Sequence, residues 1–197
     1  MEKIILASNN AHKIKEFKEI FTNTEILSLK DIGYFDDIIE DGNTFEENSL
    51  IKARAISAYL KEQGIVANVI ADDSGLCVDA LNGEPGIFSA RYSGDHNDAQ
   101  NRAKLLSKLN GKTNRTAHFN CTLVELSPDG KYIVAVGKTF GTITTEELGD
   151  KSFGYDCLFL SDELNKTFGQ ASAEEKNSVS HRGRAIKKLI ELRNNKK

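Results

Sequence analysis

Short apolar runs that alternate with helix-length apolar stripes constrain the fold of this chain most strongly. The run from Lys3 to Ala7 predicts a buried strand, and the apolar spacing over 14–21 predicts a helix directly after it. Further strands are expected at Glu25 to Leu29 and at Val66 to Ala71. Strands that alternate with helices in this way are typical of an α/β domain built around a sheet.

The clearest predicted helix follows Thr44. Thr44 and Glu47 have the spacing of a capping box, an apolar face follows them, and Gly64 is expected to end the helix. Two more helices are expected, one capped by Asp98 and one at the C-terminus capped by Ser180.

Residues 116–138 predict a β-hairpin, because apolar and polar side chains alternate on both sides of the turn sequence SPDG. Another short strand is expected after FGYD at 153–156. The 197 residues contain no repeat or linker. They therefore predict a single α/β domain over 1–197, with an antiparallel hairpin lobe at about 116–138.

Composition excludes several classes of function. The 26 Lys and Arg are outnumbered by 29 Asp and Glu, so the chain lacks the basic field that binding to nucleic acid requires. Its cysteines form no C-x-x-C pair and its histidines no H-x-x-x-H pair, which argues against a disulfide framework and a zinc hydrolase. No apolar stretch has the length of a membrane span or signal peptide, so a cytoplasmic protein without a membrane partner is expected.

Two adjacent carboxylates, Asp72 and Asp73, follow the predicted strand at Val66 to Ala71. Ligands of open α/β sheets bind at the carboxyl ends of strands, and paired carboxylates there suit Mg²⁺. The alternative is that both aspartates accept backbone hydrogen bonds in a turn that leads to Gly75. Glu40 could add a third carboxylate, or it could be a solvated acid in a loop.

Two segments could bind phosphate. The sequence SNNAHK at 8–13 joins a strand to a helix, where backbone N–H groups and a lysine favour an anion. It could equally be an asparagine-rich helix cap with a surface lysine. Asn48 and Lys52 lie four residues apart and share a helix face, which could point to a phosphate chain or to solvent.

Two later segments could recognise a purine base. In FGYD at 153–156, Phe153 could stack on a base while Asp156 reads its edge. The alternative is a turn with core aromatics. His181 and Arg182 open the C-terminal helix and could donate to a carbonyl oxygen, or could form an ordinary basic first turn.

Together these segments closely resemble the inosine triphosphate pyrophosphatases, also called non-canonical purine NTP or dITP/XTP pyrophosphatases. The resemblance rests on five motifs that occur in family order and span nearly the whole chain. They are SNNAHKIKE, EDGNTFEENSLIKA, ADDSGLCVDALNGEPGIFSARYSG, FGYDCLF and EEKNSVSHRGRA.

The resemblance implies an elongated α/β fold with a mixed central sheet flanked by helices, two lobes with the active-site cleft between them, and a homodimer. It implies Mg²⁺-dependent hydrolysis of ITP, dITP and XTP to the monophosphate and pyrophosphate. Asp73 then matches the general base and metal-site carboxylate, Glu40 matches a metal-site glutamate, and Asp72 belongs to the same acidic cluster. The positions that match the family's substrate contacts are Ser8, Asn9, Asn10, Ala11, His12, Lys13, Asn48, Lys52, Ser74, Phe153, Gly154, Tyr155, Asp156, Lys176, His181 and Arg182.

Two positions depart from the family pattern. Cys157 stands where the family usually has proline, and Asn9 where glycine is common. The first could loosen the base-recognition loop slightly, and neither changes a proposed catalytic group. Two other classes of function remain: a module that binds purine triphosphates without hydrolysis, and a phosphatase that releases single phosphates. The acidic residues disfavour the first, and product identification would separate the second.

Overall fold

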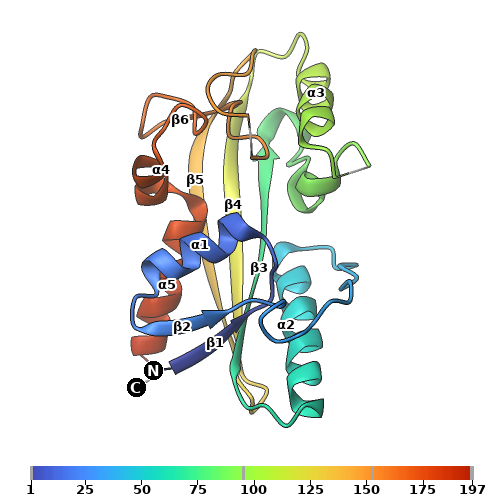
Figure 1. The fold of residues 1–197 in the computed structure, drawn as a ribbon. Coiled ribbons are helices and arrows are strands. Elements are labelled where there is room, and N and C mark those ends of the chain that lie inside the picture. The colour runs from blue at the N-terminus through green and yellow to red at the C-terminus, as the bar shows by residue number, and fades with distance from the viewer. Residues whose placement is uncertain (1, 95, 152, 196–197) are drawn as a thin grey trace. The chain divides into compact units, whose positions relative to one another are not determined.

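The computed structural model describes residues 2–94, 96–151 and 153–195 (Figure 1). Its six-stranded sheet has the order β2-β1-β3-β4-β5-β6. The strands are β1 (Glu2–Leu6), β2 (Thr24–Leu27), β3 (Asn68–Val78), β4 (Thr116–Leu126), β5 (Tyr132–Ile143) and β6 (Phe159–Ser161). The helices are α1 (Ala11–Ile20), α2 (Phe45–Glu62), α3 (Asp98–Lys108), α4 (Ala173–Val179) and α5 (His181–Asn194), with short 3-10 helices η1 (Asp79–Leu81) and η2 (Gly86–Arg91).

The sheet is mixed, as expected. β1 pairs in parallel with both β2 and β3, whereas β5 and β6 are antiparallel. The predicted hairpin also forms, and its turn is closed by a hydrogen bond from the Ser127 amide to the Lys131 carbonyl. Its strands β4 and β5 are inner strands of the sheet, between β3 and β6.

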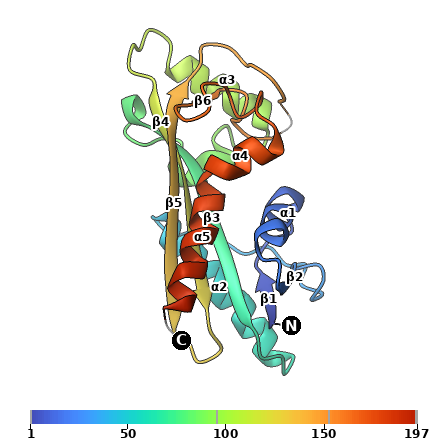
Figure 2. The same ribbon diagram turned by 90° about the vertical axis from the view of Figure 1, so that its left-hand side faces the viewer.

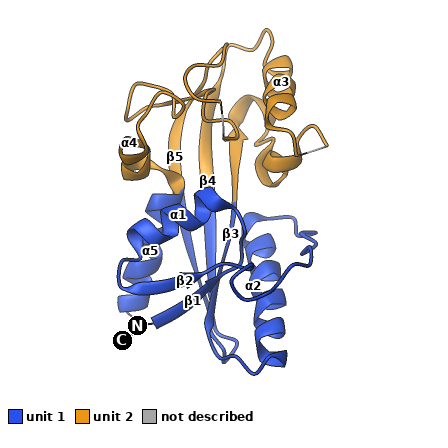
Figure 3. Ribbon diagram, in the orientation of Figure 1, with its two compact units in different colours: residues 1–73, 121–137, 182–197 blue, residues 74–120, 138–181 orange. Residues whose placement is uncertain are grey.

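The chain divides into two compact units (Figure 3). Unit 1 comprises Met1–Asp73, Cys121–Gly137 and Arg182–Lys197, and unit 2 comprises Ser74–Asn120 and Lys138–His181. The boundaries cross β3, β4 and β5, each of which contributes residues to both units. None of the helices in the described residues is both long and apolar enough to cross a membrane.

Unit 1 has helices on both faces of its part of the sheet. α1 and α5 cover one face and α2 the other (Figures 1 and 2). Side chains of a strand alternate between faces, so neighbours in β3 enter different cores. Ile70 packs with Phe17 of α1 and Leu189 of α5, whereas Val69 and Ala71 pack in the core under α2.

Unit 2 has its own apolar core beneath α3. It contains Leu76 and Val78 of β3 together with Leu105 of α3, all fully buried. The C-terminal part of β3 thus packs in a second core, and η1 follows directly after Val78. A β-carbon added to Gly75 would lie 2.2 Å from the Gly86 carbonyl oxygen, so only glycine permits this close approach.

The structure corrects the predicted strand end. β3 continues through Asp72 and Asp73 to Val78, so the two aspartates lie inside a strand and the turn interpretation is wrong. The neighbouring strand β1 is the one that ends here, because Leu6 pairs with Ile70. The carboxylates therefore lie just beyond the end of a parallel neighbour.

Most predicted helix boundaries are confirmed. Thr44 and Glu47 form the capping box of α2, and α5 begins directly after Ser180. The predicted cap of α3 is wrong, because the Asn97 side chain accepts the hydrogen bond from the Gln100 amide. The helices η1, η2 and α4 were not predicted from the sequence.

Candidate active site

Asp73 lies in a charged group on the α2 side of β3. The Asn48 side-chain amide donates to Asp73 Oδ2 at 3.1 Å. Lys52, one helical turn after Asn48, places its Nζ 2.6 Å from Glu40 Oε2 and 4.0 Å from Asp73 Oδ1. Both α2 residues are buried, so the interpretation of this helix face as solvent-facing is wrong.

The charge of Asp73 is only partly compensated. Burial raises the pKa of its carboxyl group, and the attraction of Lys52 and the hydrogen bond from Asn48 offset only part of that effect. The negative charge of Glu40 acts in the same direction as burial. A buried carboxylate whose pKa is raised is suited to accept a proton during a reaction.

Asp72 has a different set of partners on the other side of the strand. Its Oδ1 accepts from Lys13 Nζ of α1 at 2.9 Å, and its Oδ2 lies 3.4 Å from Arg182 Nε of α5. Arg182 also pairs with Glu16 of α1 at 2.6 Å. Burial alone would raise the pKa of Asp72, but the charges of Lys13 and Arg182 outweigh it and lower the pKa below its usual range.

The three predicted metal ligands therefore do not share one set of contacts. Glu40 and Asp73 meet at Lys52, whereas both oxygens of Asp72 face other cations. Within the described residues, no three His, Cys, Asp or Glu side chains converge into a group that could hold a metal ion, so any ion here would need ligands from the substrate. The separation follows from the strand itself, because consecutive side chains point to opposite faces.

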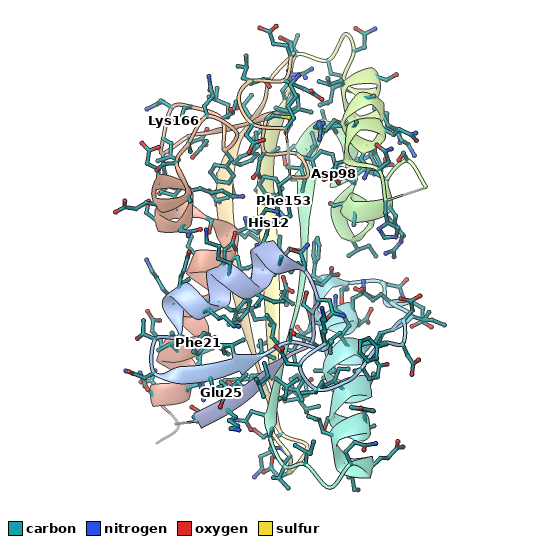
Figure 4. All side chains as sticks on the ribbon, viewed as in Figure 1. His12, Phe21, Glu25, Asp98, Phe153 and Lys166 are labelled. Atoms are coloured by element: carbon teal, nitrogen blue, oxygen red, sulfur yellow. The ribbon has the colours of Figure 1, made fainter. Side chains whose placement is uncertain are left out.

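The loop at 8–13 is a helix cap, as one of its two interpretations held. The Asn10 side chain accepts from the backbone amides of His12 and Lys13, and the Asn10 amide donates to Ser8 Oγ at 3.1 Å. The Asn9 side chain accepts from the Lys30 amide. Several backbone N–H groups expected to be free are thus occupied, and polar side chains remain exposed at the start of α1, where Figure 4 labels His12.

Lys13 is not the plain surface lysine of that interpretation. It is one-fifth exposed, and its ammonium group is held by Asp72. Ala11 is exposed beside it at the first position of α1. The segment therefore combines a capped helix start with one anchored positive charge.

In unit 2, the predicted base-recognition residues form a second group. Lys176 of α4 makes an ion pair with Asp156, and its Nζ lies 5.0 Å from the centre of the Phe153 ring. Tyr155 is a core aromatic, as the alternative held, and its hydroxyl donates to the Ser89 carbonyl at 2.8 Å. Phe153 is half-buried, so its ring keeps an accessible part.

His181 and Arg182 are adjacent but belong to different units. The His181 ring is buried and stacks on Phe119 in unit 2, with ring centres 4.9 Å apart. The Arg182 guanidinium is in unit 1 and binds Asp72 and Glu16. Ser74, the first residue of unit 2, is half-buried in β3.

Sequence reasoning missed three residues that hold these groups. Glu16 binds Arg182, and its position three residues after Lys13 on one helix face was the available signal. Asp98 accepts from the Gly154 amide, and Arg102 donates to the Gly154 carbonyl. Their spacing of four on α3 places both on one face, but the sequence does not show which loop they meet.

The model of the Ham1 family matches residues 4–192. The chain belongs to the Ham1 family. Among Ham1 relatives, the dITP/XTP pyrophosphatase of Clostridium perfringens is 51% identical over 96% of both chains, and that of Leuconostoc mesenteroides is 47% identical over 95% of this chain and 94% of the relative.

Solved Ham1 structures show the same fold. The Ham1 protein of Staphylococcus aureus superposes with a TM-score of 0.88 at 41% identity, over 100% of both chains. The Ham1 protein of Coxiella burnetii gives a TM-score of 0.88 at 34% identity, over 99% of this chain and 100% of that one. The predicted family and the α/β fold class are confirmed by these matches.

Proposed function

We propose that this Ham1 protein hydrolyses the non-canonical purine nucleotides ITP, dITP and XTP to the monophosphate and pyrophosphate. Such hydrolysis would clear them from the nucleotide pool before they are incorporated into DNA and RNA. The observation that carries the proposal is the Asp73 carboxylate, buried beside Lys52 and Glu40 with a raised pKa. The names of the curated relatives support the choice of substrate.

Asp73 is the proposed general base. Its carboxylate would take a proton from the water that attacks the α-phosphorus, a role that contributes on the order of 10²–10⁴-fold to rate. The hydrogen bond from Asn48 orients one oxygen, Oδ2, and leaves Oδ1 facing Lys52 at 4.0 Å. The carboxylate is thereby fixed in direction without being neutralised.

Glu40 and Asp73 fit a magnesium ion. Their oxygens approach the same Lys52 ammonium group, so this spot already attracts positive charge, and Mg²⁺ commonly uses one or two carboxylates together with substrate phosphates. When bound, the ion would supply charge neutralisation at the phosphate oxygens. Asp72 fits a ligand role less well, because both of its oxygens meet Lys13 or Arg182.

Lys13, Lys52 and the polar side chains of 8–10 are the proposed contacts of the triphosphate. Lys13 lies in the first turn of α1, next to the cap at Asn10, and Asp72 holds its ammonium group at 2.9 Å. We propose that Asp72 contributes by fixing Lys13. A cation fixed in advance stabilises the leaving pyrophosphate without the cost of reorganisation.

Phe153, Asp156, Lys176 and His181 of unit 2 are the proposed contacts of the base. Hypoxanthine and xanthine carry a keto oxygen at position 6, which accepts from N–H donors such as Lys176 and His181. Adenine has an amino group there, and facing two donors would cost about 1–3 kcal/mol for each unsatisfied group. The proposed enzyme would therefore prefer ITP and XTP to ATP.

Arg182 was predicted to be another donor to the base. Its contacts with Asp72 and Glu16 favour a supporting role on the phosphate side instead. We also propose Mg²⁺ dependence, a homodimer and a cytoplasmic location, which rest on the family resemblance and the composition.

A nucleotide panel with product identification tests the function. The purified protein is incubated with ITP, dITP, XTP, GTP and ATP, with Mg²⁺ or with a chelator, and pyrophosphate and orthophosphate are measured separately. We expect pyrophosphate from the three non-canonical substrates, far faster than from ATP, and only with Mg²⁺. Orthophosphate release would indicate a phosphatase, and binding without turnover would indicate a sensor; either result contradicts the proposal.

A further inference from the structure

We propose that Asp98 and Arg102 of α3 are positioning residues for base recognition, because together they grip the peptide groups of Gly154. This inference rests on the proposed function, since it assigns what holds the base-recognition segment 153–156 in place. Neither residue is among the substrate contacts that the family resemblance implies.

The grip has two contacts on one residue. The Gly154 amide donates to Asp98 Oδ2 at 2.8 Å, and the Gly154 carbonyl accepts from an Arg102 terminal nitrogen at 2.9 Å. Asp98 and Arg102 are four residues apart on α3, so their side chains leave the same helix face. Figure 4 labels Asp98 and Phe153, which lie close together in unit 2.

Arg102 is itself fixed. Its side chain is buried, and its Nε donates to Glu147 Oε1 at 2.7 Å. Glu147 also pairs with Lys151 at 3.0 Å. The guanidinium group therefore reaches Gly154 from a rigid position, with its charge balanced.

The backbone of Gly154 needs these two hydrogen bonds to stay in one conformation. Its φ of +50° lies in the left-handed region, and glycine can leave this conformation at little cost. The recognition groups lie just before and two residues after Gly154: the ring of Phe153, and the carboxylate of Asp156, whose amide donates to the Phe153 carbonyl at 3.2 Å. Fixing both polar groups of Gly154 selects one direction for these side chains.

The grip would act on the base and not on the phosphates. Phe153 and Asp156 both contact Lys176, so a shift of this turn would move the whole group that faces the base. Asp98 and Arg102 belong to unit 2, whereas Lys13, Lys52 and Asp73, the proposed contacts of phosphate and water, belong to unit 1. Loss of the grip should therefore weaken base binding selectively.

The test compares three variants with one control. Asp98→Ala removes the acceptor, whereas Asp98→Asn keeps an oxygen that can accept from the Gly154 amide. Arg102→Lys keeps the positive charge but loses the rigid group that donates to both Glu147 and Gly154. Gln100→Ala is the control, because Gln100 is an exposed residue of the same helix. Calorimetry measures the affinity of each protein for inosine monophosphate and, separately, for pyrophosphate, and steady-state assays give kcat and KM for ITP.

We expect Asp98→Ala and Arg102→Lys to weaken inosine monophosphate binding about tenfold, the size of one lost hydrogen bond, with pyrophosphate binding unchanged within about twofold. KM for ITP should rise by a similar factor, more than kcat falls. Asp98→Asn and Gln100→Ala should stay near the wild type.

Several results would overturn the inference. They are an equal loss of affinity for pyrophosphate, no loss for inosine monophosphate, or an Asp98→Asn variant as weak as Asp98→Ala. Failure of the proposed function would look different: the wild type itself would release no pyrophosphate from ITP, whatever the variants do.

Discussion

At Asp72 and Asp73, the two faces of β3 carry the same carboxyl group, but its pKa is shifted in opposite directions. Asp72 is bound by Lys13 and Arg182, and these cations lower its pKa. Asp73 has Asn48 and a more distant Lys52, and burial raises its pKa. Adjacent residues therefore differ because a strand sends them into different surroundings.

The difference assigns two roles. The charge of a buried carboxylate that is paired with two cations is fully compensated. Removing that carboxylate therefore lowers the stability of the fold. A buried carboxylate with partial compensation retains reactivity, which is how active sites commonly differ from structural ion pairs. Asp72 is thus the expected anchor and Asp73 the expected base.

The largest expected effect is on stability, from Asp72→Asn. The substitution leaves Arg182 buried with one anion instead of two, and breaking a buried pair typically costs about 3–5 kcal/mol. Urea unfolding measures the loss, with Asp162→Asn as a matched change at an exposed acid. An unfolding free energy equal to that of the wild type would show that Asp72 is no anchor.

A smaller effect is expected from Glu16→Ala, which removes the second anion of Arg182. A hydrogen bond to a charged group contributes about 1.5–3 kcal/mol, and Asp72 remains in place to hold the guanidinium group. Unfolding of Glu16→Ala, of Asp72→Asn and of the double variant forms a cycle. The two changes should be coupled, and strictly additive losses would argue against a shared network.

Asn48→Asp probes the other face. A second carboxylate beside Asp73 disfavours its anion, so the pKa of Asp73 should rise further. The base must be deprotonated to act, so the acidic limb of the kcat/KM profile for ITP should move to higher pH. Asn48→Ala removes the donor without adding charge and should move that limb less. An unmoved limb in Asn48→Asp would argue that Asp73 is not the titrating base.

The smallest effect is expected from Thr44→Ala at the capping box of α2. Loss of such a cap costs about 0.5–2 kcal/mol of stability. Asn48 and Lys52 lie further along the helix, so the acidic limb of the pH profile should not move. Thermal unfolding and the same pH profile check both parts, and a shifted limb would mean that α2 itself sets the state of Asp73.

Local patterns in the sequence predicted the parts of the fold that depend on neighbours in the chain. The Thr44 and Glu47 capping box is one such part, because both of its hydrogen bonds close within four residues. The strand through Asp72 and Asp73 could not be predicted in this way. Aspartate is disfavoured in strands, and the cations that stabilise it here lie 59 and 110 residues away.

The same limit explains the wrong cap predicted for α3 and the separate partners of Asp72 and Asp73 in the candidate site. Asn97 and Asp98 are both good capping residues, and the structure uses Asn97 because Asp98 meets Gly154, 56 residues away. Family resemblance placed Asp72 with Asp73 in one acidic cluster, since adjacency in the sequence looks like adjacency in space. Alternation along the strand separates them.

The most direct test of this contrast is pyrophosphate release from ITP by Asp73→Asn, measured together with its unfolding free energy. The account predicts a turnover at least about a hundredfold below the wild type, the lower range for loss of a general base. It also predicts that stability is unchanged or higher, because a neutral amide replaces a poorly compensated buried charge. Near-normal turnover, or inactivity that merely accompanies unfolding, would contradict it.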